Sequence, residues 1–211
     1  MALLTSSLVY LTGDVPGTAG VIKQRSEDFI VEEQPLYEPT GEGEHLMIFI
    51  EKENRTTIDT VKRLARVFKV KRRDIGYAGL KDKRAITRQH LTVHLPDPSQ
   101  DEYLLNRIGH TPIKLLWAAR HKNKLKRGHL SGNRFTIKIR EVDPGHVIRA
   151  KQSIDRLVAT GVPNFLGEQR FGYRQNNHLL GRALLKRDWQ AFLDELCGKP
   201  LPEDPPPTRT G

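Results

Sequence analysis

Asp82 is the acidic residue of GLKDKRAITRQ, a basic stretch that covers residues 79–89. Lys81 precedes it, Lys83 and Arg84 follow it, and Arg88 lies close behind. Cations that point toward a carboxylate favour its ionised form, and an ionised carboxylate can act as a nucleophile or as a base. The alternative interpretation is an ordinary turn residue, because Asp is common in turns.

Charge is gathered in blocks along the 211-residue chain, whose formal net charge is +10. Residues 61–90 hold eleven Lys or Arg against two Asp, and residues 114–140 hold nine Lys or Arg and no acid. Residues 23–53 are acidic, with nine acids against three bases. Like charges gathered on one fold repel each other unless a polyanion meets them, so we expect a nucleic acid as the partner.

The single cysteine, Cys197, excludes an internal disulfide and is typical of a cytoplasmic protein. The eight histidines show no metal-like spacing, so we expect no metal site. The first residues lack a basic region, and no apolar run approaches the roughly 18 residues that a membrane span needs. We therefore expect a soluble protein without a membrane partner.

Apolar patterns predict an α+β fold with a mainly antiparallel sheet and packed helices, because the strands come in adjacent pairs and do not alternate regularly with helices. The predicted strands cover residues 45–52, 74–78, 86–95, 113–119 and 134–142. The predicted helices cover residues 57–68, 147–159 and 178–196. Asp82 then lies in the connection between two strands, 74–78 and 86–95.

The predicted helices are amphipathic. Thr57 is the candidate cap of the first helix, whose apolar stripe begins at Ile58 and whose outer face is basic. In the second helix, the residues expected to face inward are Val147, Ile148, Ile154, Leu157 and Val158. In the last predicted strand, Phe135, Ile137 and Ile139 share one face.

Four stretches follow one another at a specific spacing: EDFIVEEQPLYEPTGEGEHLMIFIEKENRTT, GYAGLKDKRAITRQ, ARHKNKLKRGHLSGNRF and GVPNFLGEQRFG. In this order the sequence resembles the tRNA pseudouridine synthase D (TruD) family over residues 8–190. The resemblance implies an isomerase that converts a uridine in tRNA, typically uridine 13, to pseudouridine without a cofactor. It places the family's essential aspartate at Asp82, which would either attack the ribose or remove a sugar proton.

The resemblance also implies a uridine pocket around Asp82. Its expected members are Lys23, Phe29, Lys81, Asn164, Leu166, Gln169, Arg170 and Phe171. Lys23 and Phe29 would line the base, although a strand-edge Lys and a core Phe are the alternative interpretations. Lys81 would be the pocket's cation, yet a sequence neighbour of Asp82 on an extended segment would point the other way.

The remaining pocket positions lie in PNFLGEQRFG. Asn164 matches a family Asn that helps to hold the catalytic loop, with a turn Asn as the alternative, and Arg170 suits a phosphate or a carboxylate. Leu166 stands where the family usually has an aromatic residue, so uridine binding is expected to be weaker if that aromatic stacks on the base.

The basic blocks are the expected tRNA surface. Its predicted residues are Lys62, Arg63, Arg66, Lys71, Arg72, Arg73, Arg84, Lys122, Lys124, Lys126 and Arg127. The alternative function is a non-catalytic RNA-binding module with a structural Asp82. A nuclease or phosphotransferase is disfavoured, because no acidic metal cluster or His pair lies in the basic blocks.

The expected domain organisation is a partial catalytic domain over residues 1–197 and a mobile tail over residues 198–211, which hold five prolines. The resemblance implies an inserted domain and a returning C-terminal part after the stretch NNHLLGRALLKRDW. Three interpretations follow: the chain is a fragment, it pairs with a missing second lobe of the same protein as a further partner, or the lone lobe has another role.

Overall fold

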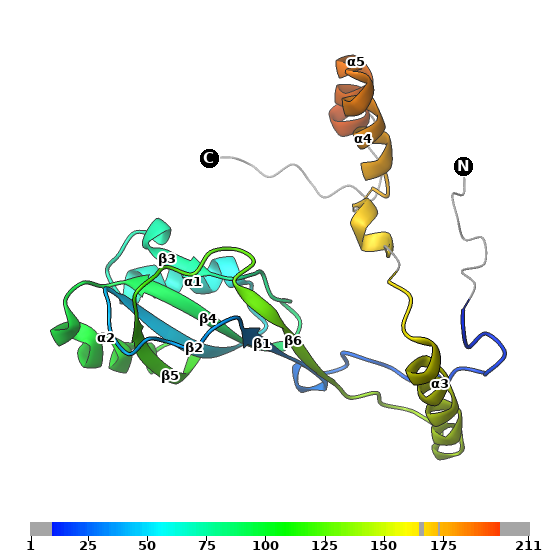
Figure 1. The fold of residues 1–211 in the computed structure, drawn as a ribbon, viewed down its shortest axis with the longest axis horizontal. Helices are drawn as coiled ribbons and strands as arrows, with labels where there is room; N and C mark the ends of the chain where they lie inside the picture. The colour runs from blue at the N-terminus through cyan, green and yellow to red at the C-terminus, as the bar shows by residue number, and fades with distance from the viewer. Residues whose placement is uncertain (1–9, 165–166, 173, 199–211) are drawn as a thin grey trace. The chain divides into compact units, whose positions relative to one another are not determined.

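The structure, a computed structural model, describes residues 10–164, 167–172 and 174–198 (Figure 1). The chain divides into two compact units, one ending at Ser153 and the other beginning at Ile154. The predicted tail from residue 199 onward lies outside the described residues.

The first unit is built on a six-stranded sheet (Figure 1). Its strands are β1 (Phe29–Pro35), β2 (His45–Glu53), β3 (Ile75–Tyr77), β4 (Ile86–His94), β5 (Ile113–His121) and β6 (Leu130–Ile137). They lie in the order β5-β2-β4-β1-β6, with β3 paired to β4. Only β1 and β4 run parallel among the described pairs, which confirms an α+β fold with a mainly antiparallel sheet.

The helices of the sheet unit are α1 (Thr57–Val67) and α2 (Asp101–Ile108). Both pack on the sheet in one apolar cluster, where Leu64 of α1 and Ile108 of α2 are fully buried with Ile48, Ile50 and Leu91 of the central strands. In β4 the buried Leu91 and Val93 flank Thr92, because successive side chains of a strand point to opposite faces, whereas β2 is apolar on both faces from Leu46 to Ile50. This core fixes the strand ends from which the Asp82 segment extends.

Helix α1 differs from the prediction at its first turn. Thr56, not Thr57, is the N-cap, since its hydroxyl accepts a hydrogen bond from the backbone N–H of Asp59. Thr57 is buried instead, and Ile58 is exposed rather than part of the apolar stripe. The outer face is basic as predicted, with Arg63 and Arg66 exposed.

The last strand and the next helix also differ from the prediction. Strand β6 runs over Leu130–Ile137, so it begins and ends earlier than residues 134–142, and Phe135 and Ile137 are exposed. Helix α3 (Val147–Thr160) has no buried residue, although Val147, Ile148, Ile154 and Val158 were expected to face inward. An amphipathic pattern predicts an apolar face, but only a neighbouring element can bury it.

The second unit contains the end of α3 and two short helices, α4 (Asn177–Lys186) and α5 (Trp189–Leu193). They match the predicted helical range of residues 178–196, with α4 beginning one residue earlier. Ala183 is buried, whereas Leu184 and Trp189 are exposed.

Candidate functional site

Asp82 lies in the loop that connects β3 to β4, as the sequence predicted. The backbone N–H of Lys81 donates to Oγ1 of the buried Thr57 at 3.0 Å. That hydroxyl in turn donates to Oε1 of Gln89 at 2.9 Å. The loop is thus tied to the first turn of α1 and to β4, while the Asp82 side chain itself is 51% exposed and available to a substrate.

The cation beside the Asp82 carboxylate is Lys23, whose Nζ lies 3.9 Å from Oδ1. The same ammonium lies 3.8 Å from the centre of the Phe29 ring, a cation–π contact. Lys23 adopts a positive φ of 58°, which is uncommon for a residue other than glycine. The Lys23 ammonium therefore lies beside both the Asp82 carboxylate and the Phe29 ring, two residues that the resemblance assigns to the same pocket.

Arg140 positions the segment that carries Lys23. Its backbone exchanges two hydrogen bonds with Val21 at 2.9 Å, and its guanidinium donates to the buried carboxylate of Asp28 at 2.7 Å. Hydrogen bonds from Arg140 hold the pKa of Asp28 below its ordinary value, against the opposing effect of desolvation. Arg140 thus binds the chain on both sides of Lys23, at Val21 and at Asp28.

Lys81 points away from Asp82, as alternation along an extended segment predicts. Its Nζ lies 2.6 Å from Oε2 of Glu33, and both side chains are nearly fully buried. Oε1 of Glu33 accepts from the backbone N–H of His90 at 3.0 Å and lies 3.3 Å from Nδ1 of the same residue. Lys81 is therefore an anchor of the loop within the protein, not a cation directed at the Asp82 carboxylate.

Glu33 remains ionised in this buried place. Burial raises the pKa of its carboxyl, but hydrogen bonds from His90 and Lys81 outweigh that effect and leave the pKa lowered overall. Glu33 was not predicted from the sequence, because nothing in the local pattern of β1 distinguishes it from its partly exposed neighbours Glu32 and Gln34.

Phe135 is a second residue that the sequence analysis did not assign to the site. Its ring lies 6.0 Å from that of Phe29 in an edge-to-face arrangement at 65°. Phe135 is half exposed, whereas Phe29 is almost buried. The exposed ring therefore offers an apolar face next to Lys23 and Phe29.

Lys52 is a third missed residue. Its side chain is buried at the end of β2, and its Nζ donates to the main-chain oxygens of Arg55 and Asp82. Burial lowers the pKa of the Lys52 ammonium to about 8, an effect that the Asp82 carboxylate opposes and Lys81 reinforces. An isolated Lys between two Glu residues gives no sequence signal for such a role.

The two basic blocks meet in space beside β3. Nζ of Lys124 donates to the main-chain oxygen of Arg73, and the guanidinium of Arg127 donates to the Tyr77 hydroxyl at 3.4 Å. Gly76 permits this approach, because a Cβ there would lie 2.4 Å from the main-chain oxygen of Leu125. Residues far apart in sequence therefore form one basic surface.

A groove of about 500 Å³ lies within this surface. It is lined by Lys62, Ala65, Arg66, Val70, Lys71, Arg72 and Arg73. Lys62 also lies 3.8 Å from Asp59, and Lys122 pairs with Glu42 at 2.7 Å. These two predicted RNA-binding lysines thus have intramolecular carboxylate neighbours, while Arg84 is exposed in the Asp82 loop.

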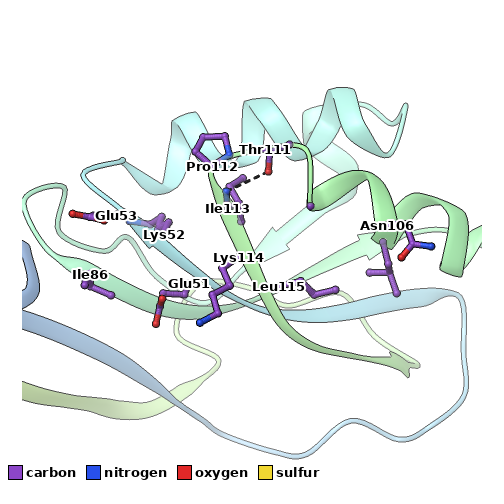
Figure 2. Close-up of a pocket in the computed structure, with 12 residues that line it drawn as sticks. Glu51, Lys52, Glu53, Ile86, Asn106, Thr111, Pro112, Ile113, Lys114 and Leu115 are labelled. Atoms are coloured by element: carbon purple, nitrogen blue, oxygen red, sulfur yellow. Dashed lines mark hydrogen bonds between the residues drawn. The ribbon is translucent and has the colours of Figure 1, made fainter.

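A second groove, of about 590 Å³, lies between α2 and the ends of β2 and β5, and Asp82 does not line it (Figure 2). Its lining includes Lys52, Lys114 and Asn106. Within the described residues, no group of three or more His, Cys, Asp or Glu residues is arranged to hold a metal ion. None of the helices described is long and apolar enough to cross a membrane.

The other predicted pocket residues belong to the second unit. Asn164 and Arg170 are exposed, and the Phe171 ring lies 5.8 Å from that of His178. The main-chain oxygen of Arg170 accepts from Asn177 at 3.0 Å. Gln169 falls in the 3-10 turn Glu168–Phe171, and Leu166 lies outside the described residues. Within the first unit, the structure therefore brings together Lys23, Phe29 and the Asp82 loop.

Comparison with known proteins gives a consistent family. The family model described as tRNA pseudouridine synthase D (TruD) matches residues 6–211. The tRNA pseudouridine synthase D of Geobacter metallireducens is 51% identical over 191 residues, which cover 90% of this chain and 46% of the relative. That of Geobacter sulfurreducens is 50% identical over 192 residues, with the same shares covered.

A solved structure supports the same fold. The crystal structure assigned to tRNA pseudouridine synthase D (TruD) from Methanosarcina mazei matches with a TM-score of 0.75 and 32% identity. The match covers 92% of this chain and 45% of that one. The chain thus spans about half the length of the relatives it matches.

Proposed function

This chain belongs to the tRNA pseudouridine synthase D (TruD) family, and on that premise we propose that it carries the Asp82 side of an enzyme that isomerises a uridine in tRNA to pseudouridine. The observation that carries the proposal is the half-exposed Asp82 carboxylate with the Lys23 ammonium at 3.9 Å. We extend it to uridine 13 because that is the position implied by the family resemblance.

The Asp82 carboxylate can act in two routes that replace the bond between the ribose and the base nitrogen by a bond to carbon 5 of the base. It can attack the ribose carbon that bears the base, so that the base leaves as an anion and a covalent sugar ester forms. It can instead remove a proton from the neighbouring sugar carbon, which also releases the base. In the first route the base turns and its carbon 5 displaces the Asp82 carboxylate from the sugar carbon, which breaks the ester. In the second route carbon 5 of the turned base bonds to the same sugar carbon while the neighbouring sugar carbon regains its proton from Asp82. Both routes end with release of the proton of carbon 5. This chemistry draws on no cofactor.

The neighbours of Asp82 have distinct roles in this proposal. The Lys23 ammonium stabilises the carboxylate and the negative charge that develops on the departing base. Phe29 and Phe135 provide an apolar wall for a uridine that has left its stack, whose extrusion costs a few kcal/mol. Asn164, Leu166, Gln169, Arg170 and Phe171 are proposed as further pocket residues from the family motif alone.

The basic surface beside β3 is proposed to bind the tRNA backbone. Arg66 and Arg72 from the first block and Lys124 and Arg127 from the second supply cations there. Contacts to phosphate position an RNA without reading its sequence. The surface therefore explains affinity, and the Asp82 pocket explains the choice of reaction.

The test is Asp82→Asn in a protein that joins this chain to the remaining length of the Geobacter metallireducens relative. The change keeps side-chain size but removes the charge, so tritium release from carbon 5 of uridine should fall by at least about 10³-fold while tRNA binding persists. Asp143→Asn is the matched control, since Asp143 caps a turn by accepting from Gly145 at 2.8 Å. Turnover retained in Asp82→Asn would refute the catalytic role. Binding without turnover in the unchanged protein would favour the RNA-binding module instead.

A further inference from the structure

Lys52 is a buried cation directly behind the Asp82 loop. Its side chain is 1% exposed, and its Nζ lies 2.6 Å from the main-chain oxygen of Arg55 and 3.3 Å from that of Asp82. The residue occupies the inner face of β2, in register with Thr87 of β4 and Ile113 of β5. Its side chain is therefore enclosed by the protein, and its ammonium reaches the backbone of the Asp82 loop.

Burial of this ammonium has a free-energy cost. A charge removed from water is destabilising unless its interactions in the protein replace hydration, and an apolar side chain of similar volume is often equally good or better for stability. The described acceptors of Lys52 are two main-chain carbonyls. The hydrogen bonds of Lys52 therefore stabilise mainly the local backbone conformation at Arg55 and Asp82.

We propose that Lys52 is a positioning residue, which holds the main chain of Asp82 so that the carboxylate stays beside Lys23. The inference rests on the proposed function, because it assigns a task to Lys52 in that same reaction. The ammonium binds the carbonyl of Asp82 and leaves the carboxylate free for the substrate. Charge-assisted hydrogen bonds of this kind are roughly twice as strong as neutral ones.

Two other contacts hold the preceding residue. Thr57 accepts from the backbone N–H of Lys81, and Glu33 pairs with its ammonium. These contacts fix the loop up to Lys81, on the N-terminal side of the Asp82 Cα. Lys52 holds the carbonyl of Asp82 on the other side, so the Cα that carries the carboxylate is held from both directions. A displacement of about 1 Å there can reduce a rate by about 10²-fold.

A pH profile provides a signature that a purely structural role would lack. The charged groups facing Lys52 are Asp82 and Lys81 of the loop, while its register partners on β4 and β5 are uncharged. Because burial lowers the pKa of Lys52 to about 8, the amine loses its charge as the pH rises past that value. The rate should then fall, while stability should rise, since the unfolded chain still binds that proton up to its ordinary pKa.

The experiment compares Lys52→Met with Lys186→Met, which removes an exposed lysine of α4 outside both basic blocks. Hydrogen exchange of the peptide over residues 79–85 measures the loop directly, and tritium release from the extended protein measures catalysis. Lys52→Met should speed exchange in that peptide at least about 10-fold and lower kcat about 10²-fold. KM for tRNA and exchange in β2 and β4 should stay within about twofold of the wild type, as should every value for Lys186→Met.

Lys52→Gln is the conservative variant, because it retains an N–H donor without the charge. Its kcat should lie between those of wild type and Lys52→Met, and both variants should lose the fall in rate above pH 8. Unchanged exchange at residues 79–85 in Lys52→Met would overturn the proposal, and so would faster exchange with an unchanged kcat. A wild-type protein without label release would refute the proposed function, while the exchange data would still decide whether Lys52 holds the loop.

Discussion

Asp82 and Lys81 are neighbours in sequence, yet their side chains have opposite environments. The carboxylate of Asp82 is half exposed beside Lys23, whereas the ammonium of Lys81 is buried against Glu33. An extended segment alternates its side chains, so one residue can anchor the loop while the next stays open to solvent. The buried ion pair between Lys81 and Glu33 anchors the loop that carries the exposed Asp82 carboxylate.

Glu33→Gln tests the buried pair at the residue scale. The change leaves the Lys81 ammonium buried without its counter-charge, so the free energy of unfolding should fall by about 3–5 kcal/mol. Urea denaturation provides the measurement. Glu32→Gln is the control, because Arg88 retains Glu51 as a partner and the partly exposed pair should contribute under about 1 kcal/mol. Equal losses in the two variants would contradict a special role for the buried pair.

At the scale of elements, the central strands bring histidines into a row. His45 of β2 lies in register with His94 of β4 and with His121 of β5. The ring centres of His45 and His94 are 5.0 Å apart, and His121 stacks on Tyr37 at 5.2 Å. Desolvation lowers the pKa of both His45 and His121, and the proximity of His94 lowers that of His45 further.

This row predicts acid sensitivity of the sheet. Since the folded-state pKa values are lowered, the unfolded chain binds more protons, and stability should fall as the pH drops below about 6.5. Each such imidazole contributes at most about 1.4 kcal/mol per pH unit. His121→Phe keeps a ring against Tyr37 but removes one titrating group, so unfolding free energies measured from pH 7 to 5 should show a shallower slope. An unchanged slope would show that His121 does not contribute.

At the scale of the whole molecule, charge far apart in sequence becomes one surface. Contacts of Lys124 with Arg73 and of Arg127 with Tyr77 join the two basic blocks around β3. A phosphate backbone can meet such a surface continuously, and its counterions are released on binding. Binding to tRNA should therefore depend strongly on salt.

Six phosphate contacts would give a log–log salt slope of about −4 to −5. Replacing Arg66 and Arg72 together by Glu should make that slope shallower by about 1.5–2 and weaken binding to RNAs of similar shape alike. Filter binding or fluorescence anisotropy at several salt concentrations measures both effects. Arg107→Glu on α2 lies outside both basic blocks and should leave the slope as it is. A slope near zero would exclude this surface as the RNA-binding site.

The chain spans 46% of its Geobacter metallireducens relative, and it exposes apolar residues on its later elements. Exposed members include Val158, Leu185, Trp189 and Leu193. A cleft that holds an extruded uridine needs two walls, so we expect residues 1–211 alone to release label at least about 10²-fold more slowly than the full-length relative. Parallel assays on one tRNA preparation measure the difference. Comparable rates would contradict the need for a second lobe.

The sequence by itself determined the strand and helix periods, the blocks of charge and the location of Asp82 between two strands. These features depend on residues close together in the chain, where alternation and turn chemistry act locally. The family motifs added Lys23 and Phe29, which the structure places beside the Asp82 loop.

Only the tertiary structure decided which distant side chains meet. Strand β4 lies between β2 and β1, so Lys52 and Glu33 approach the same loop from different strands. Strand order and register arise from the packing of the whole core, because a local pattern specifies which residues face inward but not which strand lies alongside. The same reason explains why the sequence predicts the apolar face of α3 but not its exposure. Burial of that face depends on a neighbouring element, and α3 has no buried residue.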